Sequence, residues 1–369
     1  MSGITSVALP SDYGMMNSLV TNAATVKQRL DQLISQASTG LISNTYAGLG
    51  AGASISLNMQ PQIANMQTLQ NNVDVATGRM SVTQTALTSL QSIASSFYAQ
   101  LNNVDRIDSS AVDTIAASAR DALRQVAGLL DTQDAGVYVF SGQDTANPPV
   151  PDPDNIADGT AGTFFATIQT AVGQLGVTQT AAQVAQTTQG VAGFGGVPSP
   201  FSVYLSTNDP PTLPTIQVGQ NQSETIGLSA SHNGLIPQPP ADVVNFTTTG
   251  SYMRDTLRAL ATIGSLSSAQ VNTPGFQDLV QNTRTSLIGV VSAMGQDAGV
   301  LGNVQSSIKA TQTQLADTQT ALNMQVSSAQ NVDMASTLSQ LSQVQTQMQA
   351  SYQLISGLSG LSLVKYLPV

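Results

Sequence analysis

The chain has 369 residues, of which 11 are Lys or Arg and 21 are Asp or Glu, so its formal net charge is −10. This acidic balance argues against nucleic acid and anionic membrane surfaces as partners, because their phosphates attract clustered basic residues. The sequence has no Cys and a single His, His232, which excludes disulfides, thiolate chemistry and Cys- or His-rich metal centres within one chain.

The first residues, 1–16, lack a basic segment followed by an apolar run, so we expect no cleaved signal peptide. No stretch of about 18 apolar residues is present, so we expect no membrane insertion. Residues 145–250 hold 12 of the 16 Pro, whereas 15–135 and 251–366 are rich in Ala, Ser, Thr, Gln and Leu. Because Pro breaks helices, this composition predicts a mainly α protein with a turn-rich, β-rich insertion.

Two helices and one long heptad seam are predicted in the first third of the chain. An apolar pattern from Leu19 to Ala37 predicts the first helix, and another pattern predicts a helix over 109–132. Between them, apolar residues recur every seven positions, with Thr83 interrupting the companion row three residues behind. The residues of this first seam are Met59, Met66, Val73, Met80, Leu87, Ala94 and Leu101.

The middle of the chain has short β-prone runs between turn signals. These runs are VYVF (137–140), FSVYL (201–205), TIQV (215–218) and ETIGL (224–228), and each predicts a strand. Helices are expected near 164–174 and 180–187. The middle segment is therefore expected to form a small domain of its own.

A second seam follows in the last third. Thr273 is expected to cap its helix with Pro274 in the first turn. Asp297, Thr311 and Thr318 weaken its companion row. A last helix is predicted from Met334 to Ile355. The residues of the second seam are Val280, Leu287, Met294, Leu301, Ile308, Leu315 and Leu322.

The last helix has no charged residue between Met334 and Val364. An ordinary exposed helix carries Glu and Lys, and burying such charges is unfavourable. A helix of Gln, Ser, Thr and apolar residues loses little when it is desolvated, so the segment is suited to burial against neighbouring subunits. The alternative is an ordinary bundle within one chain.

No arrangement of residues in the sequence indicates catalysis. The glycines of GLGAGAS (48–54) follow no predicted strand and have no Lys beside them, which disfavours a phosphate loop. Asp152, Asp154 and Asp158 have only part of the spacing of a calcium loop, and the intervening Pro residues favour a solvated turn. We therefore expect no enzyme activity, no cofactor and no resident metal.

Four segments carry a resemblance to a known family. Residues 321–367 (ALNMQVSSAQNVDMASTLSQLSQVQTQMQASYQLISGLSGLSLVKYL) and 30–50 (LDQLISQASTGLISNTYAGLG) resemble the terminal segments of the bacterial flagellin superfamily. Residues 128–150 and 217–237 are most similar to its hook-associated protein 3 family of hook–filament junction proteins. The sequence departs from the family at 40–43, where Gly-Leu-Ile-Ser stands in place of Gly-Lys-Arg-Ile, and no acidic cluster follows.

The resemblance implies a three-part, elongated organisation. Paired terminal helices (D0) are expected at 1–45 and 330–369, and a helical bundle with a β-hairpin (D1) at 46–144 and 251–329. A small β-rich outer domain (D2) is expected at 145–250. The family also implies export through the flagellar channel to an extracellular flagellum, with terminal helices that are disordered in the free monomer and ordered on assembly.

Three functional hypotheses remain open. The first is a structural subunit that joins hook-side proteins to the filament, with further copies of itself, hook-associated protein 1, flagellin, the flagellar export apparatus and a secretion chaperone as partners. The second is a flagellin that forms the filament itself, and the third is a cell-surface glycan-binding homologue. The residues expected at subunit interfaces are Leu19, Val26, Leu30, Leu33, Leu338, Leu341, Met348, Tyr352, Ile355, Leu358 and Leu361.

Overall fold

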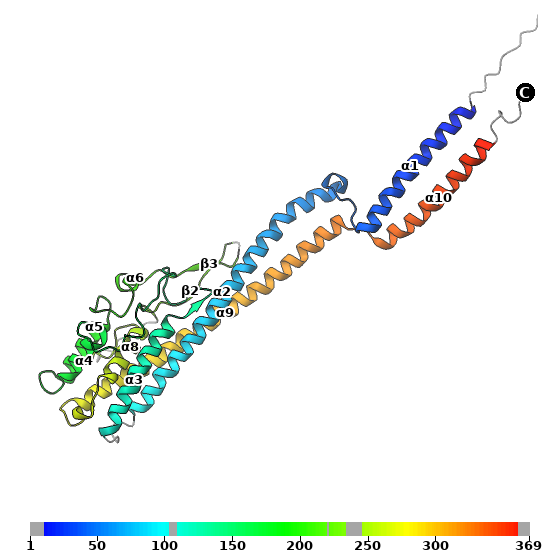
Figure 1. Cartoon of the computed structure of the whole chain (residues 1–369). Helices are drawn as coiled ribbons and strands as arrows, with labels where there is room; N and C mark the ends of the chain where they lie inside the picture. Colours follow the sequence, from blue (N-terminus) through cyan, green and yellow to red (C-terminus); the bar gives the residue numbers. More distant parts are fainter. Residues whose placement is uncertain (1–10, 103–108, 220, 234–245, 361–369) are drawn as a thin grey trace, which may run out of the picture. The chain divides into compact units, whose positions relative to one another are not determined.

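The structure is a computed structural model that describes residues 11–102, 109–219, 221–233 and 246–360, and the side chains of all of these except 11–16 and 358–360 (Figure 1). It is mainly helical with a few short strands, as predicted. The described residues form two compact units. One combines the chain up to Gln67 with the chain from Ala316 onward, and the other is Thr68–Leu315. The division into D0, D1 and D2 stays a prediction.

Two long helices contribute to both units. Helix α2 is Ala51–Leu101 and helix α9 is Phe276–Gln330. In the Thr68–Leu315 unit they run antiparallel, because Gln91 Nε2 donates to the Val291 carbonyl at 3.1 Å and Gln312 Nε2 donates to Asp74 Oδ1 at 2.6 Å. In the other unit, the start of α2 lies against the end of α9, where Gln330 Nε2 donates to Ser56 Oγ.

The structure places most of the two heptad seams in the core. Seam residues within Thr68–Leu315 are buried: Val73, Met80, Leu87, Ala94, Leu101, Val280, Leu287, Met294, Leu301, Ile308 and Leu315. In the other unit Met66 is buried, and Met59 and Leu322 are half-buried.

Two of the polar interruptions of the seams, Thr83 and Asp297, have neighbouring polar groups. Thr83 is fully buried and donates to the Arg79 carbonyl of its own helix at 2.8 Å. Asp297 lies beside the buried Tyr252, whose pKa is raised well above its ordinary value by burial and then by the Asp297 carboxylate. Thr83 is therefore satisfied within its own helix, and the half-buried Asp297 lies next to the buried side chain of Tyr252.

The rest of the Thr68–Leu315 unit packs around helix α8 (Tyr252–Gly264), in which every residue is buried. Helices α3 (Ser109–Leu130), α4 (Phe164–Gly173) and α5 (Ala181–Ala192) contact it (Figure 1). Side-chain caps start the two helices of the middle segment: Thr163 Oγ1 accepts from the Ala166 N–H, and Thr180 forms a capping box with Gln183. The helices predicted at 109–132, 164–174 and 180–187 are thus confirmed.

Two short antiparallel ribbons complete this unit. Strands β1 (Gln133–Asp134) and β2 (Val137–Tyr138) pair with Gln133 opposite Tyr138. They turn through Ala135 and Gly136, which both have positive φ, as a two-residue hairpin turn requires. Strands β3 (Thr215–Gln217) and β4 (Ser223–Thr225) pair with Ile216 opposite Glu224. Three of the four predicted strand segments therefore contain strands.

Two local predictions were wrong. The segment 201–205 was expected to be a strand, but helix α6 begins at Val203, where Ser202 Oγ accepts from the Leu205 N–H at 3.4 Å. This cap and the buried Leu205 override the β preference of Val203 and Tyr204. Helix α9 starts at Phe276 rather than after a Thr273 cap, because Gly275 has φ +86° and its carbonyl accepts from Leu279.

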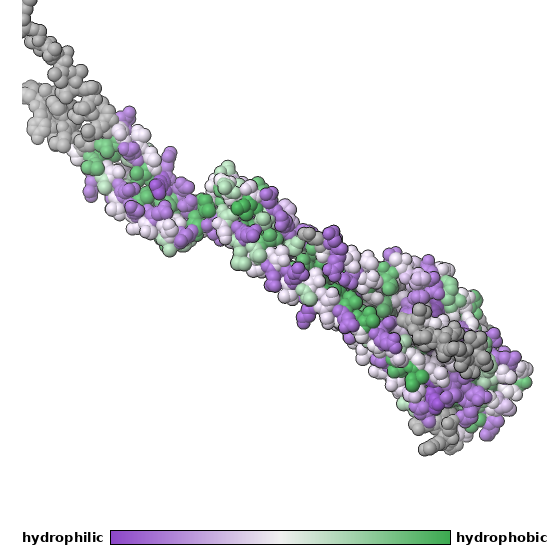
Figure 2. Space-filling model, turned by 180° about the vertical axis from the view of Figure 1, so that it is seen from behind, coloured by the Kyte–Doolittle hydropathy of each residue, from purple (hydrophilic) through white to green (hydrophobic). Residues whose placement is uncertain are grey.

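In the described part of the chain, no helix is both long enough and apolar enough to cross a bilayer. The face shown in Figure 2 has apolar residues scattered among hydrophilic ones. The described exposed apolar side chains occur on both units, for example Leu57 in one and Val300 in the other.

Replacing glycines inside the long helices with alanine is expected to change stability in opposite directions at different positions. A Cβ added at Gly299 or Gly302 of α9 meets nothing within 4 Å, whereas a Cβ at Gly52 of α2 lies 2.7 Å from the Ala329 carbonyl oxygen. We expect Gly299→Ala and Gly302→Ala to raise the free energy of unfolding by about 0.5–1 kcal/mol each, because Gly disfavours helix interiors. Gly52→Ala is expected to destabilise the chain. Urea unfolding followed by circular dichroism tests both signs, and a stabilising Gly52→Ala would contradict the close packing.

A half-buried carboxylate after α3 predicts a pH dependence. Asp131 Oδ1 accepts from the Val150 N–H at 2.9 Å, and burial raises the pKa of Asp131 to about 6 despite that bond. The unfolded value is about 3.9, so the folded chain binds the extra proton between about pH 4 and pH 6. The stability this protonation adds is full below that window and is lost as the pH rises through it.

Asp131→Asn keeps an acceptor for Val150 and removes the charge. We expect the variant to lack this part of the pH dependence and to melt at a higher temperature than the parent chain above about pH 7. Thermal melts across the window test this. A variant that loses as much stability as the parent between the two ends of the window would rule out Asp131 as the source.

Candidate subunit interface

The two terminal helices form a pair within the unit that contains the chain ends. Helix α1 is Ser11–Thr39 and helix α10 is Met334–Gly360, and they run side by side (Figure 1). Ala23 and Leu33 of α1 and Val344 and Met348 of α10 are buried on one stripe of each helix. Val344 and Met348 are four residues apart, so they lie on one face of α10, which is the face that contacts α1.

The predicted interface residues differ in how far the single chain buries them. Leu33 and Met348 are buried within the chain, so they serve the α1–α10 contact itself. Leu338 is 51% exposed and Tyr352 is 55% exposed, so both face solvent in the single chain. The half-buried members are Leu19, Val26, Leu30, Leu341 and Ile355. The side chain of Leu358 and all of Leu361 lie outside the described residues.

Further exposed apolar side chains on the pair were missed from the predicted set. On α1 these are Val20 and Ile34, fourteen residues apart; on α10 they are Met334 and Leu354. Leu338 and Tyr352 are also fourteen residues apart, so each helix has an exposed apolar row on one side of its buried stripe. The sequence did contain a signal for Val20 and Ile34, because they are two heptads apart. Lys27 lies midway between them and interrupts the apolar pattern.

A polar groove lies on the same pair, between α1 and α10. It has a volume of about 480 Å³, and Gln28, Gln32 and Gln36 line it from α1 at four-residue spacing, with Gln340 opposite on α10. Arg29 is beside them. Amide side chains can donate and accept hydrogen bonds, so the groove offers uncharged polar partners next to the apolar rows. Helix α10 can therefore bury a neighbouring helix without burying a charge of its own, whereas α1 carries Lys27 and Arg29.

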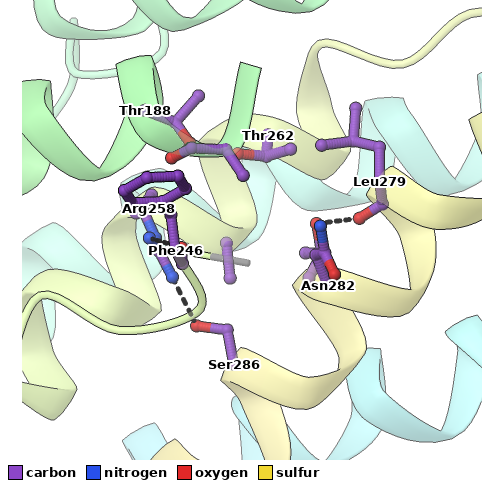
Figure 3. A pocket seen from close by; sticks show the side chains of 10 residues that line it. Thr188, Phe246, Arg258, Thr262, Leu279, Asn282 and Ser286 are labelled. Carbon is purple, nitrogen blue, oxygen red and sulfur yellow. Dashed lines mark hydrogen bonds between the residues drawn. The ribbon is translucent and has the colours of Figure 1, made fainter. Parts of the chain in front are cut away.

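A small cavity lies beside α8 (Figure 3). Thr188, Thr262 and Ser286 are among the residues that line it, and Arg258 reaches toward Ser286 Oγ at 3.0 Å. Its accessible volume of about 10 Å³ is close to that of one water molecule, too small for a substrate.

Asp255 and Arg258 beside that cavity form a buried ion pair with a separation of 3.5 Å between Oδ1 and Nη2. Asp255 also accepts from Thr248 Oγ1 at 2.6 Å and from the Thr249 N–H at 2.8 Å. Burial raises the pKa of Asp255, while Arg258 and the hydrogen bonds oppose that rise. These groups bind one another, which makes the cluster a structural anchor between α8, α9 and residues 246–249.

Two further positions singled out in the sequence have local partners. His232 Nδ1 is paired with Asp209 Oδ1 at 2.5 Å. Asp158 Oδ2 accepts from Thr160 Oγ1 at 2.6 Å within its own turn. Over the residues whose placement is described, no three His, Asp or Glu side chains come close enough to hold a metal ion.

The two end regions of the chain match known protein families. Residues 11–145 match the bacterial flagellin N-terminal helical region, and residues 288–367 match the bacterial flagellin C-terminal helical region. No curated protein sequence matches the chain. Together the two matched regions span more than half of the 369 residues and contain both α1 and α10. The chain therefore belongs to the bacterial flagellin superfamily, whose members are structural, non-enzymatic proteins exported to the flagellum outside the cell.

Proposed function

We propose that this chain is a structural subunit at the junction between the flagellar hook and filament, and that it assembles by packing its terminal helices against neighbouring subunits. The observation that carries the proposal is the exposed apolar row of Leu338 and Tyr352 on α10, a helix without charged residues. Exposed apolar rows beside uncharged polar groups fit a surface that a neighbouring subunit covers.

The choice of a junction subunit is supported by two segments that resemble junction proteins in sequence. Residues 128–150 and 217–237 contact each other in the fold: Ser141 and Ser229 form an isolated β-bridge, and the Ala230 N–H donates to the Phe140 carbonyl at 2.8 Å. The likeness therefore extends over two segments that lie together in the fold, rather than over one loop.

The second candidate is a flagellin that forms the filament itself. The two matched flagellin regions support this candidate as well as they support the junction subunit. Polymerisation of the purified full-length chain separates the candidates. A junction subunit is expected to form short assemblies, or to add to hook-side ends and stop. Long filaments that elongate from short seeds of the same chain would reject the junction role and support the flagellin alternative.

Removal of residues 334–369 tests the role of the terminal pair in either candidate. The hydrophobic cluster around α8 in the Thr68–Leu315 unit draws on residues from Ala86 to Met294 and on none from α10. We therefore expect a soluble fragment with this unit folded, unable to enter flagella. Normal incorporation of the truncated chain would show that α10 is not part of the assembly surface.

A further inference from the structure

A long stretch in the middle of the chain has no charged residue. Asp158 and Asp209 bound it, and residues 159–208 contain no Asp, Glu, Lys, Arg or His. The stretch includes helices α4, α5 and α6 (Val203–Thr207) of the Thr68–Leu315 unit. The middle of the chain therefore shares the uncharged composition of α10, although the two belong to different compact units.

This uncharged stretch presents large apolar side chains to solvent. Val197 is 82% exposed, Val203 is 80% exposed and Phe194 is 50% exposed. All three belong to residues 193–203, which we call the apolar loop. A single exposed apolar residue is ordinary on a protein surface, but three in one short loop form a patch that is suited to contact with another molecule.

The apolar loop is held in one conformation by Arg254 of α8, which is 4% exposed. Arg254 Nη1 donates to the Gly193 carbonyl at 2.9 Å. Its Cζ lies 5.9 Å from the centroid of the Phe194 ring and 4.9 Å from that of the Phe201 ring. One side chain thus contacts both the start and the end of the loop and folds it back on itself. A surface that is ordered in advance loses little conformational entropy when a partner covers it.

Charge and size both indicate a neighbouring copy of the chain as the occupant. Two copies that each have a net charge of −10 repel one another, so they approach most easily through surfaces without charge. Three side chains are also too small a surface for a stable complex, which buries about 800 Å² on each partner. Such a patch contributes where other contacts already hold two copies at high effective concentration, as in a polymer.

We propose that the apolar loop is a second subunit contact, through which the middle of one chain packs against a neighbouring copy in the assembled flagellar structure. This contact rests on the proposed assembly into the flagellum, and it applies to a junction subunit and to a flagellin alike. The loop alone does not make the free chain dimerise, because its surface is too small.

Thiol labelling tests whether the loop is covered. The chain has no Cys, so Val197→Cys and Val203→Cys each introduce a single thiol. We expect both thiols to react rapidly with a maleimide in the free chain, and at least about tenfold more slowly in assemblies of the purified chain. Dissociation of the same assemblies should restore the fast rate, which controls for damage to the thiol.

Aspartate variants test whether the contact contributes to assembly. Val197→Asp/Val203→Asp places a charge at each position, and Val197→Ile/Val203→Ile is the matched control that stays apolar. Both positions are exposed in the single chain, so circular dichroism of the monomer should not change. We expect the Asp variant to need about a tenfold higher concentration for assembly, measured by sedimentation, and the Ile control to assemble as the parent does.

Equal labelling rates in the free and assembled chains would reject the proposal, and so would an Asp variant that assembles at the parent's concentration. Labelling of flagella isolated from cells separates the occupants. Protection in flagella but not in assemblies of the purified chain would mean that a different protein covers the loop, which contradicts a contact between copies. A chain that is absent from flagella would instead reject the proposed function itself.

Discussion

Replacing Arg258 with Met is expected to lower the free energy of unfolding of the Thr68–Leu315 unit by about 3–5 kcal/mol, because it leaves the carboxylate of Asp255 buried without its counter-charge. Asp255 is fully buried and Arg258 is 4% exposed, so water cannot replace the lost partner. Arg258 also donates to the carbonyls of Phe246 and Thr247 and to Ser286. Urea unfolding followed by circular dichroism at pH 7 measures the loss.

The sequence contains a matched control for this variant. Asp121 and Arg124 of α3 have the same three-residue spacing and form an ion pair of 2.8 Å, but their side chains are 80% and 43% exposed. Arg124→Met is expected to change stability by about 1 kcal/mol or less. Equal losses in the two variants would show that burial of the Asp255–Arg258 pair has no special effect.

The double variant Asp255→Asn/Arg258→Met tests how much of the loss of stability comes from the unpaired Asp255 carboxylate. Removing both charges should recover part of the loss, because the uncompensated carboxylate is gone and Asn can still accept from Thr249. The single Arg258→Met variant should also be less destabilised in acid. The pKa of Asp255 is already raised by burial, so its protonated form is favoured in the folded chain as the pH falls.

Leu338→Asp/Tyr352→Asp is expected to prevent assembly while the monomer stays folded. Both side chains are more than half exposed in the single chain, so the fold does not depend on them. If a neighbouring subunit covers them, each contributes about 1.5–3 kcal/mol by burial, and a buried Asp adds an unfavourable desolvation. The expected result is a loss of at least about a hundredfold in assembly affinity, measured by sedimentation of polymer from monomer.

Leu338→Met/Tyr352→Phe is the matched control, because it keeps two large apolar side chains at the same positions. It should assemble nearly as the parent chain does. The Asp variant must also match the parent in circular dichroism and in hydrogen exchange of α8, so that misfolding does not imitate a lost interface. Assembly of the Asp variant at the parent's concentration would exclude this row from the subunit contact.

The long helices were predictable because their apolar residues repeat every seven positions over many turns. A β-strand does not give a seven-residue apolar repeat of that length, so the pattern indicates a helix. The two seams from Val73 to Leu101 and from Val280 to Leu315 lie in the core. The short helix α6 was not predictable in the same way. Five residues cannot show a period, and the identity of α6 depends on the Ser202 cap and the burial of Leu205, which are set by tertiary packing.

The candidate interface was only partly predictable. Apolar periodicity marks a helix face, but it cannot tell whether the chain itself or another subunit covers that face. Leu33 and Leu338 have the same kind of spacing in the sequence, and yet one is buried by α10 and the other faces solvent. The buried ion pair in α8 was also missed, because Arg254, Asp255 and Arg258 look like ordinary surface charges until the surrounding helices are placed.

The burial of α8 on all sides has a consequence for the order in which the chain can fold. The shell around it comes from residues as far apart as Ala86 and Met294, and the α1–α10 pair needs both chain ends. A chain that has emerged only in part, from either end, therefore lacks an essential piece of each unit. Contacts so distant in sequence form slowly, so the core of each unit closes only after most of the chain is available.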